Sequence, residues 1–102
     1  MKVKGIVPLQ QGTQFIIDDK IPTSWTDIYS VIQKTLKDNL PSIISVHILP
    51  TADEESGNDL IEVIHDFQEL SAEAIRHVLE EIIFDQDNKC VLMYKGQVVT
   101  PD

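Results

Sequence analysis

The fold is indicated most clearly by residues 71–84, which read SAEAIRHVLEEIIF. The apolar residues of this stretch recur at the i, i+3, i+4, i+7 and i+8 spacing of an amphipathic helix: Ile75, Val78, Leu79, Ile82 and Ile83. Ser71 is a natural helix N-cap, because its hydroxyl can accept a hydrogen bond from a free N–H of the first turn. We therefore expect a helix that begins after Ser71 and ends near Phe84 or Asp85.

A second helix is predicted earlier in the chain, over residues 25–39. Ser24 would cap it, and Asp27 occupies the capping-box position. Its inner stripe has the same helical spacing and consists of Trp25, Ile28, Val31, Ile32, Leu36 and Leu40. Pro22 and Pro41 bound the segment, since proline is poorly tolerated inside a helix.

The rest of the chain has the composition of β-strands separated by turn residues. The predicted strands are residues 2–7, 14–18, 43–49, 60–67, 90–94 and 97–100. Lys95-Gly96 between the last two strands is a two-residue hairpin signal. Gln10-Gln11-Gly12 likewise suits a hairpin between the first two.

This element order predicts one α+β domain over residues 1–102. It would be a two-layer sandwich, with an antiparallel sheet of about four to six strands and both helices on one face. The order is ββαββαββ, and its inner part matches a ferredoxin-like core. In that core the first strand already has two neighbours, so strand 2–7 would have no edge to pair with. Either the sheet order differs, or one of the first two segments is not a strand.

Several cofactor and location classes are disfavoured by composition. The four glycines are isolated, so no phosphate-binding loop is present, and no histidine pair has zinc-site spacing. We therefore expect no cofactor. Cys90, the single cysteine, cannot form an internal disulfide, and we expect it to be a buried, inert thiol. With no apolar run long enough for a membrane span and no secretory leader, these features predict a cytoplasmic protein.

The charge of the chain is strongly negative and uneven. The formal net charge is −9, and residues 38–88 carry thirteen carboxylates against Arg76 alone, a net of −12. Such a surface repels nucleic acid and anionic membranes, and it attracts basic proteins. The more common explanation for such a charge is solubility through self-repulsion.

The leading hypothesis is a non-enzymatic module that docks on a basic protein surface, as an inhibitor or a nucleic-acid mimic. The expected contact residues are Asp53, Glu54, Glu55, Glu62, Asp66, Glu73, Glu80, Glu81, Asp85 and Asp87. Acidic residues near the C-terminus of the second helix oppose its dipole, at about 0.3–1 kcal/mol each at low salt. Glu80, Glu81 and Asp85 are therefore the residues for which a functional reason is most needed.

Two other functions stay open. Strands such as the one holding Phe15, Ile16 and Ile17 look apolar on both sides, which favours a homodimer through a sheet face or an edge strand. A small metal- or histidine-dependent enzyme would use His47, His65 or His77. Strands 43–49 and 60–67 are expected to pair as a middle hairpin, across which His47 would face Glu62. His65 lies on the apolar side, where a hydrogen-bonded core role is usual.

Overall fold

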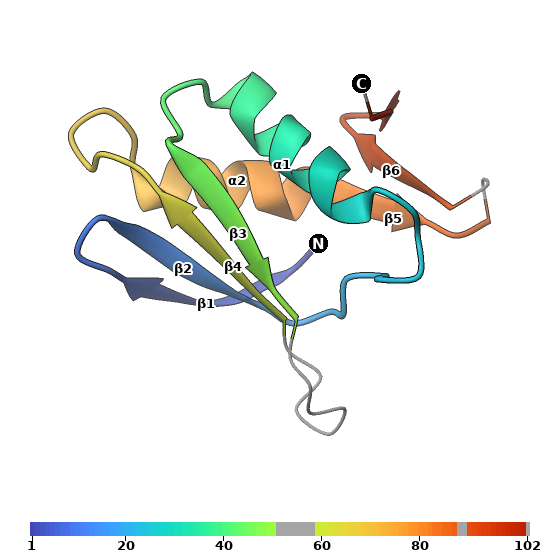
Figure 1. Ribbon diagram of the computed structural model, residues 1–102, viewed down its shortest axis with the longest axis horizontal. Helices are drawn as coiled ribbons and strands as arrows, with labels where there is room; N and C mark the ends of the chain where they lie inside the picture. The colour runs from blue at the N-terminus through green and yellow to red at the C-terminus, as the bar shows by residue number, and fades with distance from the viewer. Residues whose placement is uncertain (51–58, 88–89, 102) are drawn as a thin grey trace.

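The computed structural model describes residues 1–50, 59–87 and 90–101, and it shows an α+β fold with two helices and two antiparallel sheets (Figure 1). In chain order the elements are β1 (Val3–Pro8), β2 (Gly12–Ile17), α1 (Ile28–Asn39), β3 (Ser45–Leu49), β4 (Asp59–Ile64), α2 (Ala72–Glu81), β5 (Ile82–Asp85), β6 (Val91–Tyr94) and β7 (Gln97–Val99). Every helix and strand predicted from the sequence is present with shifted ends, and β5 is an additional strand.

The strands form two sheets instead of the single sheet that was predicted. The larger sheet has the order β1-β2-β4-β3, and the smaller one has the order β5-β6-β7. The ferredoxin-like core is not confirmed. The strand after α2 would lie beside β2 in that core, but β1 occupies this place and β5 pairs with β6. The conflict over strand 2–7 is thus resolved by a different sheet order.

The helix predicted over residues 71–84 is shorter than expected and ends at Glu81. Its last predicted residues form β5, whose side chains alternate between the two faces of the smaller sheet. Ile82 is completely buried, whereas Ile83 is 61% exposed. The helical stripe would have buried both of them. Pairing with β6, together with the β-branched character of two consecutive isoleucines, explains why this segment is extended.

Helix α1 begins three residues later than predicted, at Ile28. Asp27 holds the N-cap position in a left-handed conformation (φ 64°), and its side chain makes no capping hydrogen bond. Ser24 is therefore not the cap. Trp25 lies before the helix and packs edge-to-face on Phe84 of β5, with ring centroids 6.0 Å apart. This contact links the start of α1 to the smaller sheet.

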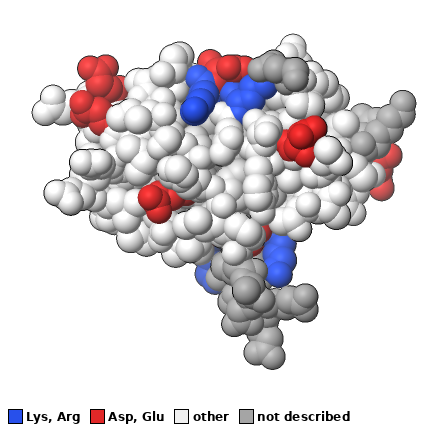
Figure 2. Space-filling model, viewed as in Figure 1, with Lys and Arg blue, Asp and Glu red and all other residues white. Residues whose placement is uncertain are grey.

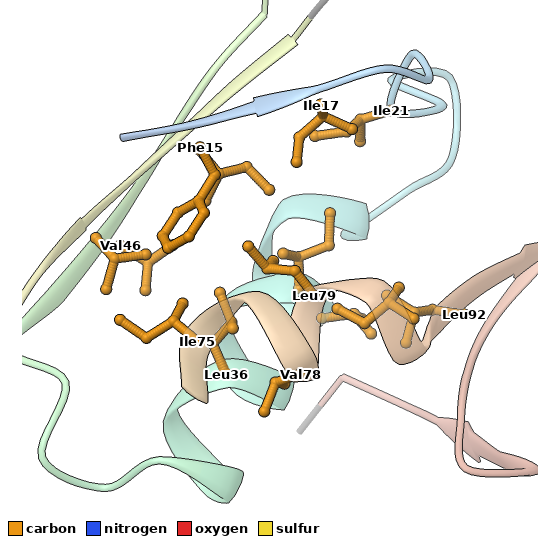
Figure 3. Packing of buried hydrophobic residues seen from close by; sticks show 14 of the residues in the cluster. Phe15, Ile17, Ile21, Leu36, Val46, Ile75, Val78, Leu79 and Leu92 are labelled. Carbon is orange, nitrogen blue, oxygen red and sulfur yellow. The ribbon is translucent and has the colours of Figure 1, made fainter. Parts of the chain in front are cut away.

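The core lies between one face of the larger sheet and the two helices. Figure 3 shows Phe15, Ile17 and Val46 from the sheet turned toward side chains of α1 and α2. The completely buried hydrophobic residues are Phe15, Ile17, Ile32, Leu36, Ile61, Val63, Ile75, Leu79 and Ile82. Burying one such side chain contributes about 1.5–3 kcal/mol, so this face holds most of the driving force for folding.

No helix of the described chain covers the outer face of the larger sheet. The register aligns Ile16, Leu60 and Leu49 in one row of this face, beside a row that contains Gln14, Glu62 and His47. Figure 2 shows the side on which β3 passes in front of α2. Charged side chains of both signs stand there in small separate groups, with uncharged atoms between them.

Candidate functional site

The acidic residues expected at a contact surface are divided among several parts of the fold. Residues 53–55 lie outside the described residues. Glu62 is on the outer face of the larger sheet, and Asp66 is in the turn that follows β4. The Oδ1 atom of Asp66 accepts a hydrogen bond from the backbone N–H of Gln68 at 2.9 Å, which fixes the direction of its carboxylate. Glu62 is therefore separated from α2 by the sheet, whereas Asp66 lies in the turn before α2.

Of the remaining five acidic residues, four lie on α2 and β5 and the fifth, Asp87, follows β5 directly. We call them the acidic α2–β5 surface: Glu73, Glu80, Glu81, Asp85 and Asp87. Arg76 lies between two of them, with its guanidinium 2.9 Å from Glu73 and 3.3 Å from Glu80. Lys95 Nζ approaches Glu81 at 3.8 Å. All these ion pairs are partly solvent-exposed, so each contributes little to stability.

The C-terminal end of α2 carries charge of the sign that its dipole disfavours. The last turn of the helix holds no basic residue, and it ends on Glu80 and Glu81, which are both exposed. The chain enters β5 directly, because Ile82 is the C-cap in an extended conformation. The negative charge is therefore concentrated where two elements meet. Two cations reach this junction from other parts of the fold: Lys95, which pairs with Glu81, and the N-terminal ammonium of Met1, which donates to the carbonyl oxygen of Ile82.

His65 has the structural role that its position on the apolar side predicted. It is 2% exposed, and its Nδ1 lies 3.1 Å from the carbonyl oxygen of Leu70. A carbonyl oxygen can only accept, so Nδ1 carries the proton. In the neutral imidazole, Nε2 is then the acceptor for the Thr13 hydroxyl, at 2.8 Å. Both ring nitrogens are satisfied, and His65 joins β2 to the segment before α2.

The other histidines are exposed and lie on different elements. His47 on β3 is paired in register with Glu62, as predicted, but no ion pair between the two is found in the described part of the chain. Its Nε2 lies 3.4 Å from Ser45 Oγ. His77 is on α2. Within residues 1–50, 59–87 and 90–101, no group of three His, Cys, Asp or Glu side chains could hold a metal ion.

The prediction that Cys90 is buried in a strand is wrong. Cys90 is exposed and precedes β6, with a left-handed backbone conformation (φ 56°). This conformation is incompatible with a regular strand, so the strand predicted over residues 90–94 begins one residue later, at Val91. Cys90 is therefore a solvent-accessible thiol at a turn.

Two exposed apolar side chains meet in a groove that sequence reasoning did not identify. We call it the Ile44–Phe67 groove. It has a volume of about 560 Å³ and is lined by Gln10, Gln11, Ile44, Ile64, His65, Asp66, Phe67 and Gln68. Ile44 is 65% exposed and Phe67 is 47% exposed. Figure 1 shows the β1–β2 turn, the start of β3 and the segment after β4 at the same end of the larger sheet.

A second groove, of about 470 Å³, lies between α1 and the β6–β7 hairpin. It contains two of the few cationic side chains, but both are already engaged. Lys34 Nζ donates to the carbonyl oxygen of Thr100 at 2.9 Å. Lys95 pairs with Glu81 and lies 5.5 Å from the centre of the Tyr94 ring. This groove is therefore less suited to an anionic ligand than its composition indicates.

Comparisons with family models, with curated proteins and with solved structures find no match for this chain. Function is therefore inferred from its own residues. In the described part of the chain, no helix is long and apolar enough to cross a bilayer. The features that remain are the acidic α2–β5 surface, the Ile44–Phe67 groove and the open face of the larger sheet.

Proposed function

We propose that this protein is a binding module that docks on a basic protein surface through the acidic α2–β5 surface. One observation carries the proposal. Residues 72–87 place four carboxylates on two consecutive elements and a fifth, Asp87, just after them, and Arg76 is the only lysine or arginine in this stretch. A protein that normally binds nucleic acid is one class of partner with a suitable basic surface, so inhibition by mimicry fits this chemistry.

The negative charge would act mainly on the rate of encounter. A net charge of −9 attracts a cationic surface over a distance of about the Debye length, roughly 8 Å at physiological ionic strength. On contact, Lys or Arg side chains of the partner would replace the exposed pairs with Arg76 and Lys95. Each such pair is worth only about 0.2–1 kcal/mol, so the exchange costs little. We expect binding that weakens steeply with added salt.

The test is an affinity pull-down from the native cell at low and high salt, with two charge variants. One variant reverses Glu80, Glu81, Asp85 and Asp87 to lysine. The matched control reverses the same number of carboxylates elsewhere: Asp18, Asp38, Glu62 and Glu69. Both variants have the same net charge, so a general charge effect would weaken both equally. We expect salt-sensitive capture to be lost in the first variant and largely kept in the control.

Capture that survives reversal of the acidic α2–β5 surface would refute the proposal. Equal loss in both variants would show that net charge alone, and no particular surface, is responsible. Circular dichroism of both variants would confirm that each keeps the native secondary structure, so that a loss of capture reports on the surface.

A second candidate function is assembly of two copies through the outer face of the larger sheet. The observation that favours it is the apolar row of Ile16, Leu60 and Leu49, of which Leu49 is 41% exposed. Light scattering that shows a monomer at high protein concentration would exclude it. A Leu49→Glu variant that converts a dimer to a monomer would support it.

Edge-to-edge assembly is less favoured by the structure than assembly through the face. The edge strand β1 carries Lys4, Pro8 and an irregular register between Val3 and Gly5. Lysine, proline and bulges are the features with which natural sheets block strand addition. On the other edge, Gln33 of α1 donates from Nε2 to the carbonyl oxygen of Val46 at 3.0 Å, which occupies part of β3.

A further inference from the structure

The Ile44–Phe67 groove combines exposed apolar surface with a concave shape. Ile44 is the most exposed of the large hydrophobic residues in the described chain, and Phe67 also lies in the same groove. Single exposed hydrophobic residues are ordinary, but two of them gathered in one concavity are typical of a binding site. Ile64 lines the groove between strand and turn.

The walls of this groove are held in place by the sheet. The ring of Phe67 lies against His65, with ring centroids 4.7 Å apart and a tilt of 60°. His65 is itself fixed through its two ring nitrogens, and its backbone N–H donates to the carbonyl oxygen of Gln11 at 3.1 Å. The backbone N–H of Ile44 donates to the carbonyl oxygen of Ile64 at 2.9 Å. A ligand would therefore meet a preformed surface and would lose little affinity to ordering it.

The polar residues of the groove define what kind of ligand fits. Asp66 lines it with a carboxylate whose direction is set by the Gln68 N–H, and Gln10, Gln11 and Gln68 supply amide groups. Amides can both donate to and accept from a peptide backbone. The carboxylate, in a protein of net charge −9, favours a cationic group beside the apolar one and repels an acidic peptide.

From this arrangement we infer that the Ile44–Phe67 groove binds a peptide segment that carries one apolar side chain next to an arginine or lysine. The apolar side chain lies between Ile44 and Phe67, and the cation reaches Asp66. The inference goes beyond the proposed function. All residues that line the groove come before α2 in the sequence, and none of them belongs to the acidic α2–β5 surface.

A second copy of this chain is a poorer occupant of the groove than a basic peptide. A two-fold contact centred on the groove would bring the two Asp66 carboxylates close together. It would also bring together two molecules that each carry a net charge of −9. Like charges at an interface oppose association, whereas a cationic peptide gains from the same field.

The test is a titration of the isotope-labelled protein with a capped six-residue peptide in which one leucine is flanked by two arginines, followed by amide NMR. We expect saturable shift changes at Ile44, Ile64, Phe67 and Gln68. Replacing the peptide's leucine by serine should weaken binding roughly tenfold or more, because the apolar contact is lost. Replacing its arginines by glutamates should abolish binding.

Protein variants make the test specific to the groove. Ile44→Ser and Phe67→Ser should each weaken binding roughly tenfold, and both positions are exposed, so folding should persist. Asp66→Asn should weaken it about two- to fivefold, since one exposed ion pair is lost. The matched control is Ile83→Ser, an equally exposed isoleucine on β5, which should leave binding unchanged.

Four results would overturn the inference. One is the absence of shift changes at the groove up to the solubility limit of the peptide. Another is binding that survives in both Ile44→Ser and Phe67→Ser. The third is shifts at the groove that depend on protein concentration without peptide, which would show self-association. Shifts confined to α2 and β5 would also reject the groove while supporting the proposed function, so the two can fail separately.

Discussion

At the scale of single residues, His65 is the side chain on which most local structure depends. It contacts Thr13 of β2, the carbonyl oxygen of Leu70 and the ring of Phe67, so one imidazole joins a central strand, the turn before α2 and the groove. The sequence indicated that His65 would be a core residue, because it continues the apolar side of β4. Its partner Thr13 could not be predicted, since Thr13 is 52 residues away in the chain.

Removing the Thr13 hydroxyl should destabilise the fold. In a Thr13→Val variant, the Nε2 atom of His65 would be buried without a hydrogen-bond donor. We expect the free energy of unfolding to fall by about 1–3 kcal/mol, as measured by urea denaturation. Thr23→Val, at an exposed position, is the control and should change it by less than about 0.5 kcal/mol. An equal effect of the two substitutions would contradict the role of His65.

The raised pKa of Tyr29 leads us to expect a loss of stability at high pH. Burial and the negative charge of Asp59 raise the pKa of the Tyr29 phenol above its ordinary value of 10.0. Because folding raises this pKa, the contribution of Tyr29 to the free energy of unfolding is complete below the pKa of the phenol in the unfolded chain. It is lost as the pH rises through the pKa in the folded protein. Absorbance titration of tyrosinate should show late ionisation, and Tyr29→Phe should reduce the alkaline loss of stability. Unchanged alkaline unfolding in that variant would contradict this.

At the scale of elements, the two helices differ in how their starts are built. Ser71 accepts a hydrogen bond from the Ala74 N–H at 3.2 Å, as its position in the sequence predicted. Ser24 was predicted to have the same role, yet α1 begins at Ile28 after a left-handed Asp27. Trp25, which the sequence pattern placed in the first turn of this helix, instead lies before it and packs on Phe84.

The two serines provide a matched pair of substitutions. We expect Ser71→Ala to lower the free energy of unfolding by about 1 kcal/mol, because an N–H of the first turn of α2 loses its partner. Ser24→Ala should change it by a few tenths of a kcal/mol at most, since Ser24 caps no helix. Thermal or urea unfolding of both variants gives the comparison. A larger effect of Ser24→Ala would place the cap of α1 where the sequence pattern had predicted it.

At the scale of the whole molecule, the acidic α2–β5 surface and the uncovered apolar row belong to different sheets. The acidic α2–β5 surface belongs to α2 and the smaller sheet, whereas the uncovered apolar row lies on the outer face of the larger sheet. The net charge of −9 also has a cost, because like charges repel one another in the folded state. Function and solubility therefore impose different demands on the same composition.

This self-repulsion predicts that moderate salt stabilises the protein. Raising NaCl from about 0.01 M to about 0.15 M shortens the Debye length from roughly 30 Å to roughly 8 Å and screens the repulsion. We expect the urea midpoint to rise over this range. The variant with Asp18, Asp38, Glu62 and Glu69 reversed to lysine should show a smaller rise. A midpoint that falls with salt in the natural chain would mean that attractive ion pairs outweigh the repulsion.

The sequence by itself determined the order of the elements apart from β5, the face of each helix that is buried and the core role of His65. These depend on periodicity and on turn residues, which act over a few positions. The Lys95-Gly96 turn is an example, with both residues at positive φ, as a two-residue hairpin requires.

Only the tertiary structure decided that β2 lies between β1 and β4, that residues 82–85 leave the helix for a second sheet, and that Ile44 and Phe67 share a groove. Strand pairing and groove formation depend on contacts between segments far apart in the chain. Several pairings were compatible with the same local pattern, and the packing of the whole core selected one of them.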